Sequence, residues 1–166
     1  MTMSSFNYNK KCSSPEELRA AALNSLDRRA CSVWELTRKL KQKGGQTEDI
    51  EPIIEEFLAQ GWLDDQKFAE SLVHDRKELY AKGPAYIKQE LYHKGVDSSI
   101  ISESIAEYYP KEDEEIILKK LLPKALMNYP QEDRDKQFKF RNKLIKRFMT
   151  QGFSYSAIQL CLASWE

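Results

Sequence analysis

The stretch LTRKLKQKGGQTEDIEPII, residues 36–54, has a pattern that returns as IKQELYHKGVDSSIISESI (87–105) and as LIKRFMTQGFSYSAIQLCL (144–162). In each copy a glycine has apolar residues eight and four positions before it and six and ten positions after it. Apolar residues four positions apart lie on one face of an α-helix, and a glycine permits the turn between two helices. Each copy therefore predicts two helices that fold back on each other through a glycine turn.

The spacing of these copies leaves room for further structure. The turn glycines Gly44, Gly95 and Gly152 are 51 and 57 residues apart, which allows one longer helix ahead of each helix pair. A match on both flanks in all three copies is hard to reach by chance, so the pattern indicates a threefold repeat. The apolar positions that we expect to be buried are Leu36, Leu40, Ile50, Ile54, Ile87, Leu91, Ile101, Ile105, Leu144, Phe148, Ile158 and Leu162.

The fold class follows from this repeat and from the scarcity of strand patterns. No alternating run of Val, Ile, Thr or aromatic residues is bounded by an Asn-Gly or Asp-Gly turn. A three-helix unit of about 50 residues has a small core, so neighbouring units must pack on one another. We therefore expect an all-α fold of three tandem three-helix repeats, in an elongated array that can curve. The expected boundaries are a flexible N-terminus at 1–14 and repeats at 15–60, 61–109 and 110–166.

Local signals at the helix ends agree with this division. Ser14-Pro15-Glu16-Glu17 is typical of a helix start, because it offers a Ser cap, a Pro in the first turn and two acids near the positive end of the dipole. Pro123 falls inside one expected helix, and we expect a kink there. Further N-caps are expected at Ser32, Thr47, Ser98, Ser154 and one of Asp64 and Asp65, and left-handed stops at Gly44, Gly83, Gly95 and Gly152. The expected helices cover residues 15–29, 33–43, 48–60, 65–81, 84–94, 99–109, 111–129, 132–151 and 155–164.

Composition argues against several classes of protein. The 166 residues include 26 basic and 26 acidic side chains, so the net charge provides no global attraction to nucleic acid. No apolar run reaches about 18 residues, so we expect no membrane span. The first 11 residues are polar and lack the apolar core of a secretion signal, so we expect a cytoplasmic protein.

The residues that usually perform chemistry are sparse. The three cysteines are far apart and form no CxxC motif, which predicts free thiols, and the two histidines lack partners at metal-ligand spacing. No GxxxxGK[ST], GxSxG or HExxH motif is present. We interpret the acidic run at 112–115 as a favourable helix start and the other acids as scattered on solvent faces. The sequence therefore predicts a protein without enzymatic activity, cofactor or metal.

Positive charge gathers in two segments that the neutral total conceals. Residues 134–147 hold seven basic residues against one acidic residue, and residues 28–43 hold six against one. In the helix expected at 132–151, one face of about 100° of arc is cationic and includes Lys136, Lys139, Lys143, Lys146 and Arg147. The opposite side is assigned to the core, although Arg141 intrudes on it, and comprises Phe138, Leu144, Ile145, Phe148 and Met149. Such a ridge can contact phosphates or an acidic protein surface, or it can be a solvated face without a partner.

The helix expected at 33–43 offers a second candidate surface. Its far side, opposite the core stripe, holds Trp34, Arg38 and Lys41 within about 60° of arc. A Trp beside two cations can anchor an interface. It can equally pack on the next bundle and take no part in binding, and the sequence leaves both interpretations open.

A longer ordered motif resembles a known family. It reads Gly61-Trp62-Leu63-Asp64-Asp65, then Phe68-Ala69, Arg76, Gly83-Pro84, Ile87, Glu90-Leu91 and Lys94-Gly95, and it is similar to the central motif of the RecX family. The earlier Trp34-Glu35-Leu36, Lys39-Leu40 and Lys43-Gly44 resemble the first repeat of that family. The resemblance covers residues 15–109 well, and it covers 111–166 only through the periodicity of the third copy.

The resemblance implies a non-enzymatic regulatory protein. RecX proteins bind the RecA recombinase filament and curb its growth, ATP hydrolysis, strand exchange and co-protease activity, and so modulate DNA repair, recombination and the SOS response. Some members also bind DNA. The present chain departs from the family before Gly83, where the run from Arg76 to Lys82 is longer and less basic than usual. This departure weakens the case for direct DNA binding by the central repeat.

The expected partner is therefore a RecA filament, contacted by a monomer, with weak binding to single- or double-stranded DNA left open. Two alternatives remain at this point: a helix-turn-helix-like DNA-binding regulator and a general helical scaffold for another protein. The first post-glycine helix begins with Glu48-Asp49, whose charge would repel phosphate. The residues that we expect to contact a partner are Arg76, Lys82, Lys88, Lys139, Lys143, Lys146, Arg147, Arg38, Lys41 and Trp34.

Overall fold

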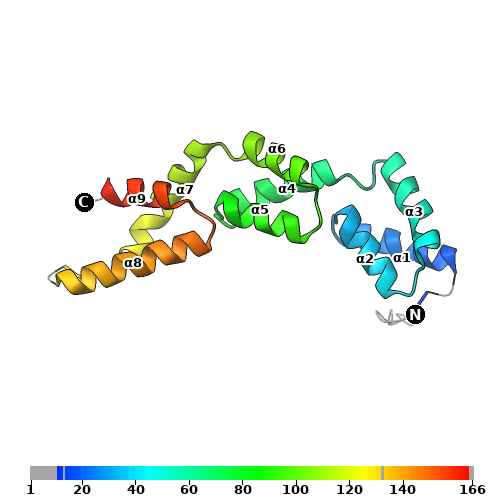
Figure 1. Ribbon diagram of the computed structural model, residues 1–166, viewed down its shortest axis with the longest axis horizontal. Helices are drawn as coiled ribbons and strands as arrows, with labels where there is room; N and C mark the ends of the chain where they lie inside the picture. Colours follow the sequence, from blue (N-terminus) through cyan, green and yellow to red (C-terminus); the bar gives the residue numbers. More distant parts are fainter. Residues whose placement is uncertain (1–10, 13, 132, 165–166) are drawn as a thin grey trace, which may run out of the picture. The chain divides into compact units, whose positions relative to one another are not determined.

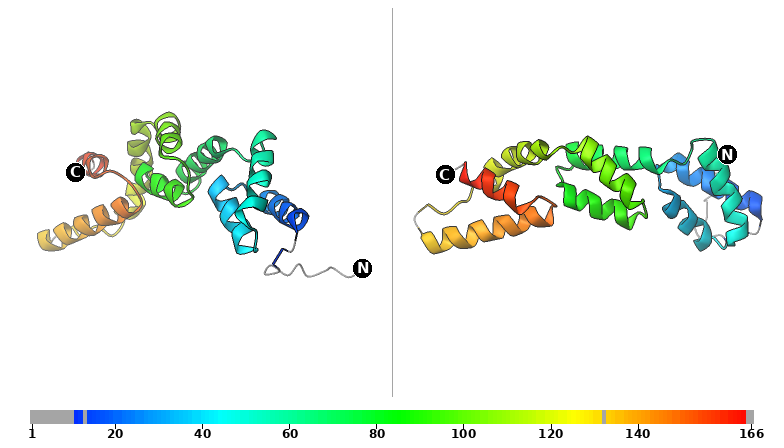
Figure 2. Two further views of the ribbon diagram at one scale, coloured as in Figure 1. Left: turned by 45° about the vertical axis from the view of Figure 1, so that its right-hand side comes forward. Right: turned by 45° about the horizontal axis from the view of Figure 1, so that its top comes forward.

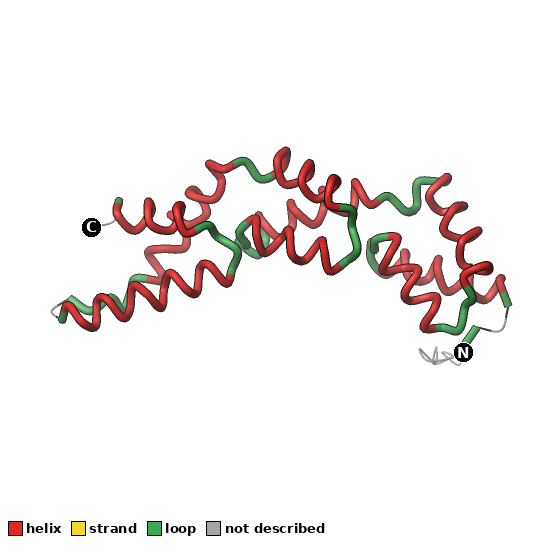
Figure 3. Tube along the Cα trace, in the orientation of Figure 1, coloured by secondary structure: helices red, strands yellow, loops and turns green. Residues whose placement is uncertain are grey.

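A computed structural model describes residues 11–12, 14–131 and 133–164 of the chain. Throughout this part the regular structure is α-helical, with no strand, which confirms the all-α fold (Figures 1 and 3). The expectation of a flexible N-terminus concerns mainly residues 1–10 and 13, which lie outside the described residues. The helices are α1 (Pro15–Arg28), α2 (Val33–Gln42), α3 (Thr47–Ala59), α4 (Asp65–Glu78), α5 (Pro84–His93), α6 (Ser98–Tyr108), α7 (Lys111–Ala125), α8 (Arg134–Thr150) and α9 (Tyr155–Ala163).

These bounds lie close to the expected ones. Helix starts differ by at most two residues, and each helix ends one to four residues before the expected end. The largest difference is in α7, where Pro123 lies in the last turn and the helix ends at Ala125 instead of kinking and continuing to residue 129. Proline lacks the N–H that would bond one turn back, so it favours an early end of the helix.

Three of the expected serine caps are confirmed and two expected caps are wrong. The side chains of Ser14, Ser32 and Ser154 each accept a hydrogen bond from a backbone N–H in the first turn of the following helix. Thr47 is instead the first residue of α3, and α6 is capped by Asp97, one residue before the expected Ser98. A carboxylate is a strong acceptor beside the positive end of a helix, which explains the choice of Asp97.

The described residues divide into two compact units. The first comprises the described residues up to Phe68 together with Lys94–Val96, and the second comprises Ala69–His93 together with the described residues from Asp97 onward. In the first unit α1 packs on α2 and α3, and α2 packs on α3. In the second unit α5 packs on α6, and α9 packs on both α7 and α8. The two further views show the same helix neighbours within each unit (Figure 2).

The repeated apolar positions form the cores of these units, as expected. Eleven of the twelve positions are buried, and the exception, Ile105, is half-buried. In the first unit they join Leu18, Ala22 and Phe57 in one cluster. In the second unit, those of the third copy join Leu118 and Leu122 of α7 in another cluster. The core therefore follows directly from the helical periodicity of the sequence.

The turn glycines hold their expected left-handed conformation at Gly44, Gly95 and Gly152, with φ of +93°, +71° and +93°. The expectation for Gly83 is wrong, because the left-handed residue between α4 and α5 is Ala81, with φ of +47°. Gly83 is required for a different reason. A Cβ at Gly83 would lie 2.3 Å from the backbone of Gly152, so only glycine allows these two segments to meet.

The three glycine turns are also held by hydrogen bonds to the same backbone position. In each turn the carbonyl just before the glycine accepts a hydrogen bond from a segment earlier in the chain. The Lys43 carbonyl accepts from the Cys12 N–H at 2.8 Å, and the Gln151 carbonyl accepts from the Gly83 N–H at 2.9 Å. The Lys94 carbonyl accepts from the hydroxyl of Ser32. Each turn is thus fastened to the segment before it, which fixes how the repeated helices follow one another inside each unit.

Candidate partner-binding surface

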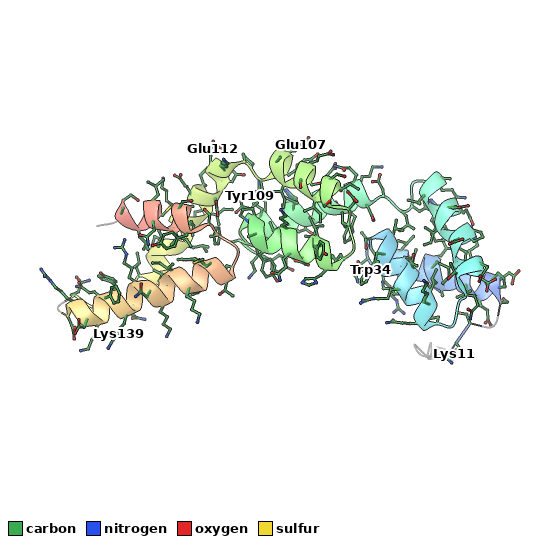
Figure 4. The ribbon with its side chains drawn as sticks, viewed as in Figure 1. Lys11, Trp34, Glu107, Tyr109, Glu112 and Lys139 are labelled. Atoms are coloured by element: carbon green, nitrogen blue, oxygen red, sulfur yellow. The ribbon has the colours of Figure 1, made fainter. Side chains whose placement is uncertain are left out.

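The outer face of α8 presents cations without acidic partners. Lys139, Lys143, Lys146 and Arg147 are exposed, and within the described part of the chain none of them forms an ion pair. We call these four residues the α8 ridge. Lys136 belongs to the same face but pairs with Asp133 at 3.1 Å. Figure 4 shows Lys139 on the side of α8 that faces away from α9.

Local contacts explain why α8 holds these cations outward. Asp133 caps the helix by accepting from the backbone N–H groups of residues 135 and 136. The inner face is fixed by Leu144 and Phe148, which are buried in the cluster shared with α7 and α9. Arg141, which intrudes on the apolar side, reaches the amide oxygen of Gln159 on α9 at 3.1 Å. Because the opposite face of α8 is packed in the core, the side chains of the ridge point into solvent.

Two apolar residues of α8 do not lie where the helical periodicity assigned them. Phe138 is 67% exposed and Met149 is 51% exposed, although both were expected in the core. On the helical wheel they lie about 80–100° from Phe148, at the edge of the apolar side. The packed neighbours α7 and α9 do not cover this edge, so both side chains remain in solvent.

The basic residues expected to bind a partner from the middle repeat have a different setting. Arg76 forms a bidentate ion pair with Glu90, with N–O distances of 2.7 and 2.6 Å. Its guanidinium also lies 4.9 Å from the centre of the Tyr80 ring, and Lys82 lies 4.8 Å from the centre of the Tyr86 ring. The charge of Arg76 is thus neutralised inside the fold. Lys88 is exposed on α5.

Lys77 was not singled out from the sequence, yet it is the most enclosed cation of this region. It bonds to the Asp113 carboxylate at 2.8 Å and to the Tyr108 carbonyl at 2.9 Å, which ties α4 to the start of α7. Burial alone would lower the pKa of Lys77, but the hydrogen bond and charge of Asp113 raise it, with a smaller effect from Glu78. Part of the acidic run at 112–115 therefore serves tertiary structure as well as the helix start.

Glu114 in the same run is also buried, so it does more than favour the helix start. Its carboxylate accepts hydrogen bonds from the backbone N–H and the hydroxyl of Ser154, the cap of α9. The carboxylate and the cap together join the first turn of α7 to the first turn of α9. Sequence reasoning missed this pairing because the two residues are 40 positions apart.

In the first unit, Trp34 lies against the Gly95 turn. A Cβ at Gly95 would lie 2.4 Å from the Trp34 side chain, and Arg38 lies over the indole with its guanidinium carbon 4.6 Å from the ring centre. Trp34 remains 43% exposed. The contact with Gly95 favours a packing role for this tryptophan. The exposed Lys41 belongs to a shallow hollow of about 210 Å³ lined by Thr37, Lys41, Thr47, Ile50, Glu51, Ile54 and Glu55.

Close to Trp34, the pKa values of the buried Glu35 and the half-buried Asp65 are shifted in opposite directions. Burial raises the pKa of Glu35, but hydrogen bonds and charges from Arg29 and Lys94 outweigh it and hold the pKa below its ordinary value. Asp65 accepts a hydrogen bond from the Val33 N–H at 2.9 Å and forms no ion pair with any described residue. Burial raises the pKa of Asp65, and the neighbouring charges of Asp64 and Glu35 add to that effect.

The described ranges offer no metal site and no membrane-spanning helix. In the described ranges, no group of three or more His, Cys, Asp or Glu side chains is arranged to hold a metal ion. Nor is any helix in those ranges long and apolar enough to cross a membrane. The α8 ridge is therefore the strongest candidate for a binding surface.

Comparison with known proteins supports the resemblance noted in the sequence. Residues 19–57 match the family model described as the first three-helix domain of RecX, and residues 64–105 match the model of the second. The regulatory protein RecX of Oceanobacillus iheyensis is 32% identical over 140 residues, which are 84% of this chain and 50% of that protein. That of Geobacillus thermodenitrificans is 32% identical over 142 residues, which are 86% of this chain and 51% of that protein.

A solved structure agrees over almost its full length. The crystal structure of RecX from Lactobacillus salivarius matches with a TM-score of 0.80 and 25% identity, covering 90% of this chain and 95% of that one. The present chain spans about half the length of the two curated relatives named above. Two successive family domains in the expected order, together with this structural match, show that the chain belongs to the RecX family.

Proposed function

We propose that this chain binds the RecA recombinase filament and inhibits its growth, ATP hydrolysis, strand exchange and co-protease activity. Membership of the RecX family supports a regulatory role, because its relatives are named regulatory proteins. In this proposal the chain acts as a monomer without catalysis of its own, in the cytoplasm. It thereby modulates recombination and DNA repair.

The observation that carries the proposal is the α8 ridge. Four exposed cations on one helix face, without acidic partners in the described part of the chain, create a local positive potential on a chain of zero net charge. Such a surface attracts an acidic partner and speeds the encounter with it. The further basic residues expected to touch the partner would add contacts of their own; they are Lys82, Lys88, Arg38 and Lys41.

Contact at several points suits a filament as the partner. If successive repeats touch neighbouring subunits of a polymer, each contact raises the effective concentration of the next, and no single contact has to be strong. A chain held in this way would block the addition of further subunits. Inhibition at amounts well below one chain per filament subunit is the expected consequence.

The direct test is ATP hydrolysis by RecA on single-stranded DNA, measured over a wide range of concentrations of this chain. We expect inhibition, and we expect the double variant Lys139→Glu with Lys143→Glu to inhibit at least about tenfold less well, because it reverses two ridge charges. Lys120→Glu with Lys124→Glu is the control, since it makes the same charge change with the same spacing on exposed positions of α7. Unchanged hydrolysis at every concentration would refute the proposal.

A DNA-binding regulator is the alternative that the ridge itself allows, because the same cations could contact phosphates. The start of α3 argues against recognition of DNA by that helix, since its first turn holds Glu48 and Asp49. Titration of duplex binding with salt separates the two functions. Tight binding to DNA without RecA, with a steep salt dependence, would favour the alternative. A general helical scaffold would instead leave RecA unaffected and retain a different protein.

A further inference from the structure

The exposed face of α8 contains more than charge. Phe138 and Met149 are the large apolar side chains on it, and both are more than half exposed. They lie about 20° apart on the helical wheel and about 16 Å apart along the helix axis. Asn142 lies beside the same line, so the three residues form a narrow strip that we call the α8 apolar edge.

The apolar edge runs alongside the α8 ridge. On the wheel, Lys146 and Lys139 follow Met149 at about 60° and 80° further round, so both sets of side chains would face one partner together. Within the described residues, Phe138 makes none of the aromatic pairs that occupy Phe140 and Phe148. Exposing a phenylalanine and a methionine to water forfeits burial energy without any gain to this fold.

The presence of apolar and cationic side chains on one face of α8 indicates the chemistry of the partner. Phosphates would satisfy the lysines but would leave Phe138 and Met149 in water. Protein interfaces are instead enriched in aromatic residues, Met and Arg at their centres, with lysines at the polar rim. A flexible thioether also adapts well to an irregular apolar surface. An acidic protein surface with an apolar pocket would satisfy both halves of the α8 face.

We propose that α8 docks on an acidic protein surface with Phe138 inserted into an apolar pocket and Met149 as a second anchor, while the α8 ridge forms the charged rim. The inference rests on the proposed function, since it describes how the partner of that function is held. Phe138 then contributes most of the affinity of the complex. The ridge increases the rate of association and makes binding sensitive to salt.

Sedimentation with RecA filaments on single-stranded DNA, at low and at high salt, tests this division. Phe138→Ala should weaken binding about tenfold or more at both salt concentrations and leave the salt dependence unchanged. Lys139→Glu with Lys143→Glu should weaken binding mainly at low salt and flatten the salt dependence. The matched control is Leu160→Ala, because Leu160 is an apolar residue of α9 that is 55% exposed, and its removal should leave binding unchanged.

The outcomes separate this inference from the proposed function. If the unaltered chain fails to sediment with filaments, the proposed function and this inference fail together. If the unaltered chain binds and Phe138→Ala binds equally well, only the inference fails. If Phe138→Ala weakens binding to single-stranded DNA alone as much as it weakens binding to filaments, the partner of this face is nucleic acid, and the inference is again wrong. Urea unfolding should show equal stability for Phe138→Ala and the unaltered chain.

Discussion

Both α4 and α8 carry basic residues, but those of α4 are paired with carboxylates and those of the α8 ridge are not. Arg76 and Lys77 each bond to a carboxylate from another helix, Glu90 and Asp113 respectively, at distances of 2.6 to 2.8 Å. The cations of the α8 ridge have no such partner in the described part of the chain. Positive charge alone therefore does not identify a binding surface. Charge that the fold has not already neutralised is the better guide.

The largest expected effect concerns the turns that fasten successive repeats. Gly152 and Gly61 both have positive φ, but a Cβ at Gly152 would lie 2.3 Å from the Tyr86 backbone nitrogen, whereas a Cβ at Gly61 would meet nothing within 4 Å. Gly152→Ala should therefore destabilise the chain by about 3–5 kcal/mol, from left-handed strain plus a backbone clash, and Gly61→Ala by about 1 kcal/mol from strain alone. Urea unfolding measures both. Equal losses would contradict the close contact at Gly152.

The next largest effect distinguishes the paired cations of α4 from the exposed cations of the α8 ridge. Arg76→Ala leaves the carboxylate of Glu90, whose side chain is 20% exposed, without its partner. We expect a loss of about 1–3 kcal/mol in the free energy of unfolding, partly restored by adding Glu90→Gln. Lys143→Ala on the ridge should change the free energy of unfolding by less than about 0.5 kcal/mol. If both alanine variants are equally stable, the division into structural and free cations is wrong.

The smallest effects are pH-dependent and have opposite signs at two neighbouring carboxylates. The raised pKa of Asp65 means that its contribution to stability is lost as the pH rises through its folded pKa. Asp65→Asn keeps an oxygen that can accept from the Val33 N–H, so it should match the unaltered chain near pH 3 and be slightly more stable at pH 7.

Glu35 provides the control of opposite sign. Its lowered pKa contributes stability at neutral pH that is lost as the pH falls through its folded pKa. Glu35→Gln should therefore be less stable than the unaltered chain at pH 7, with the difference shrinking in acid. Melting temperatures of the unaltered chain and both variants at pH 3, 5 and 7 check the two signs. Differences of the same sign at pH 7 would contradict the assignment.

Helical periodicity and local capping rules predict most of the fold. Eleven of the twelve core positions predicted from the repeat are buried, because the residues of a buried helix face lie only three or four positions apart in the sequence. Caps are local too, and the error at Ser98 amounts to one residue. The wheel places Phe138 on the apolar side but cannot show where the packed neighbours of α8 end. Exposure at that edge depends on helices that only the fold brings together.

The candidate surface is predicted less completely than the fold. The sequence identifies the ridge lysines and Arg147 as a cationic face, since their spacing is local. The sequence does not reveal that Arg76 forms an ion pair with Glu90, which lies 14 positions away. Nor does it reveal that Lys77 forms an ion pair with Asp113, which lies 36 positions away. Ion pairs between helices depend on tertiary contacts, so sequence charge overestimates the number of cations left for a partner.

The most direct test compares binding and stability on the same set of variants. The affinity for RecA filaments and the free energy of unfolding would be measured for Lys139→Glu with Lys143→Glu, for Lys120→Glu with Lys124→Glu, and for Arg76→Ala. The α8 pair should lose at least about tenfold in affinity with its stability intact, the α7 pair should lose neither, and Arg76→Ala should lose mainly stability. Equal affinity of the α8 and α7 variants for the filament would contradict the proposal that α8 holds the partner.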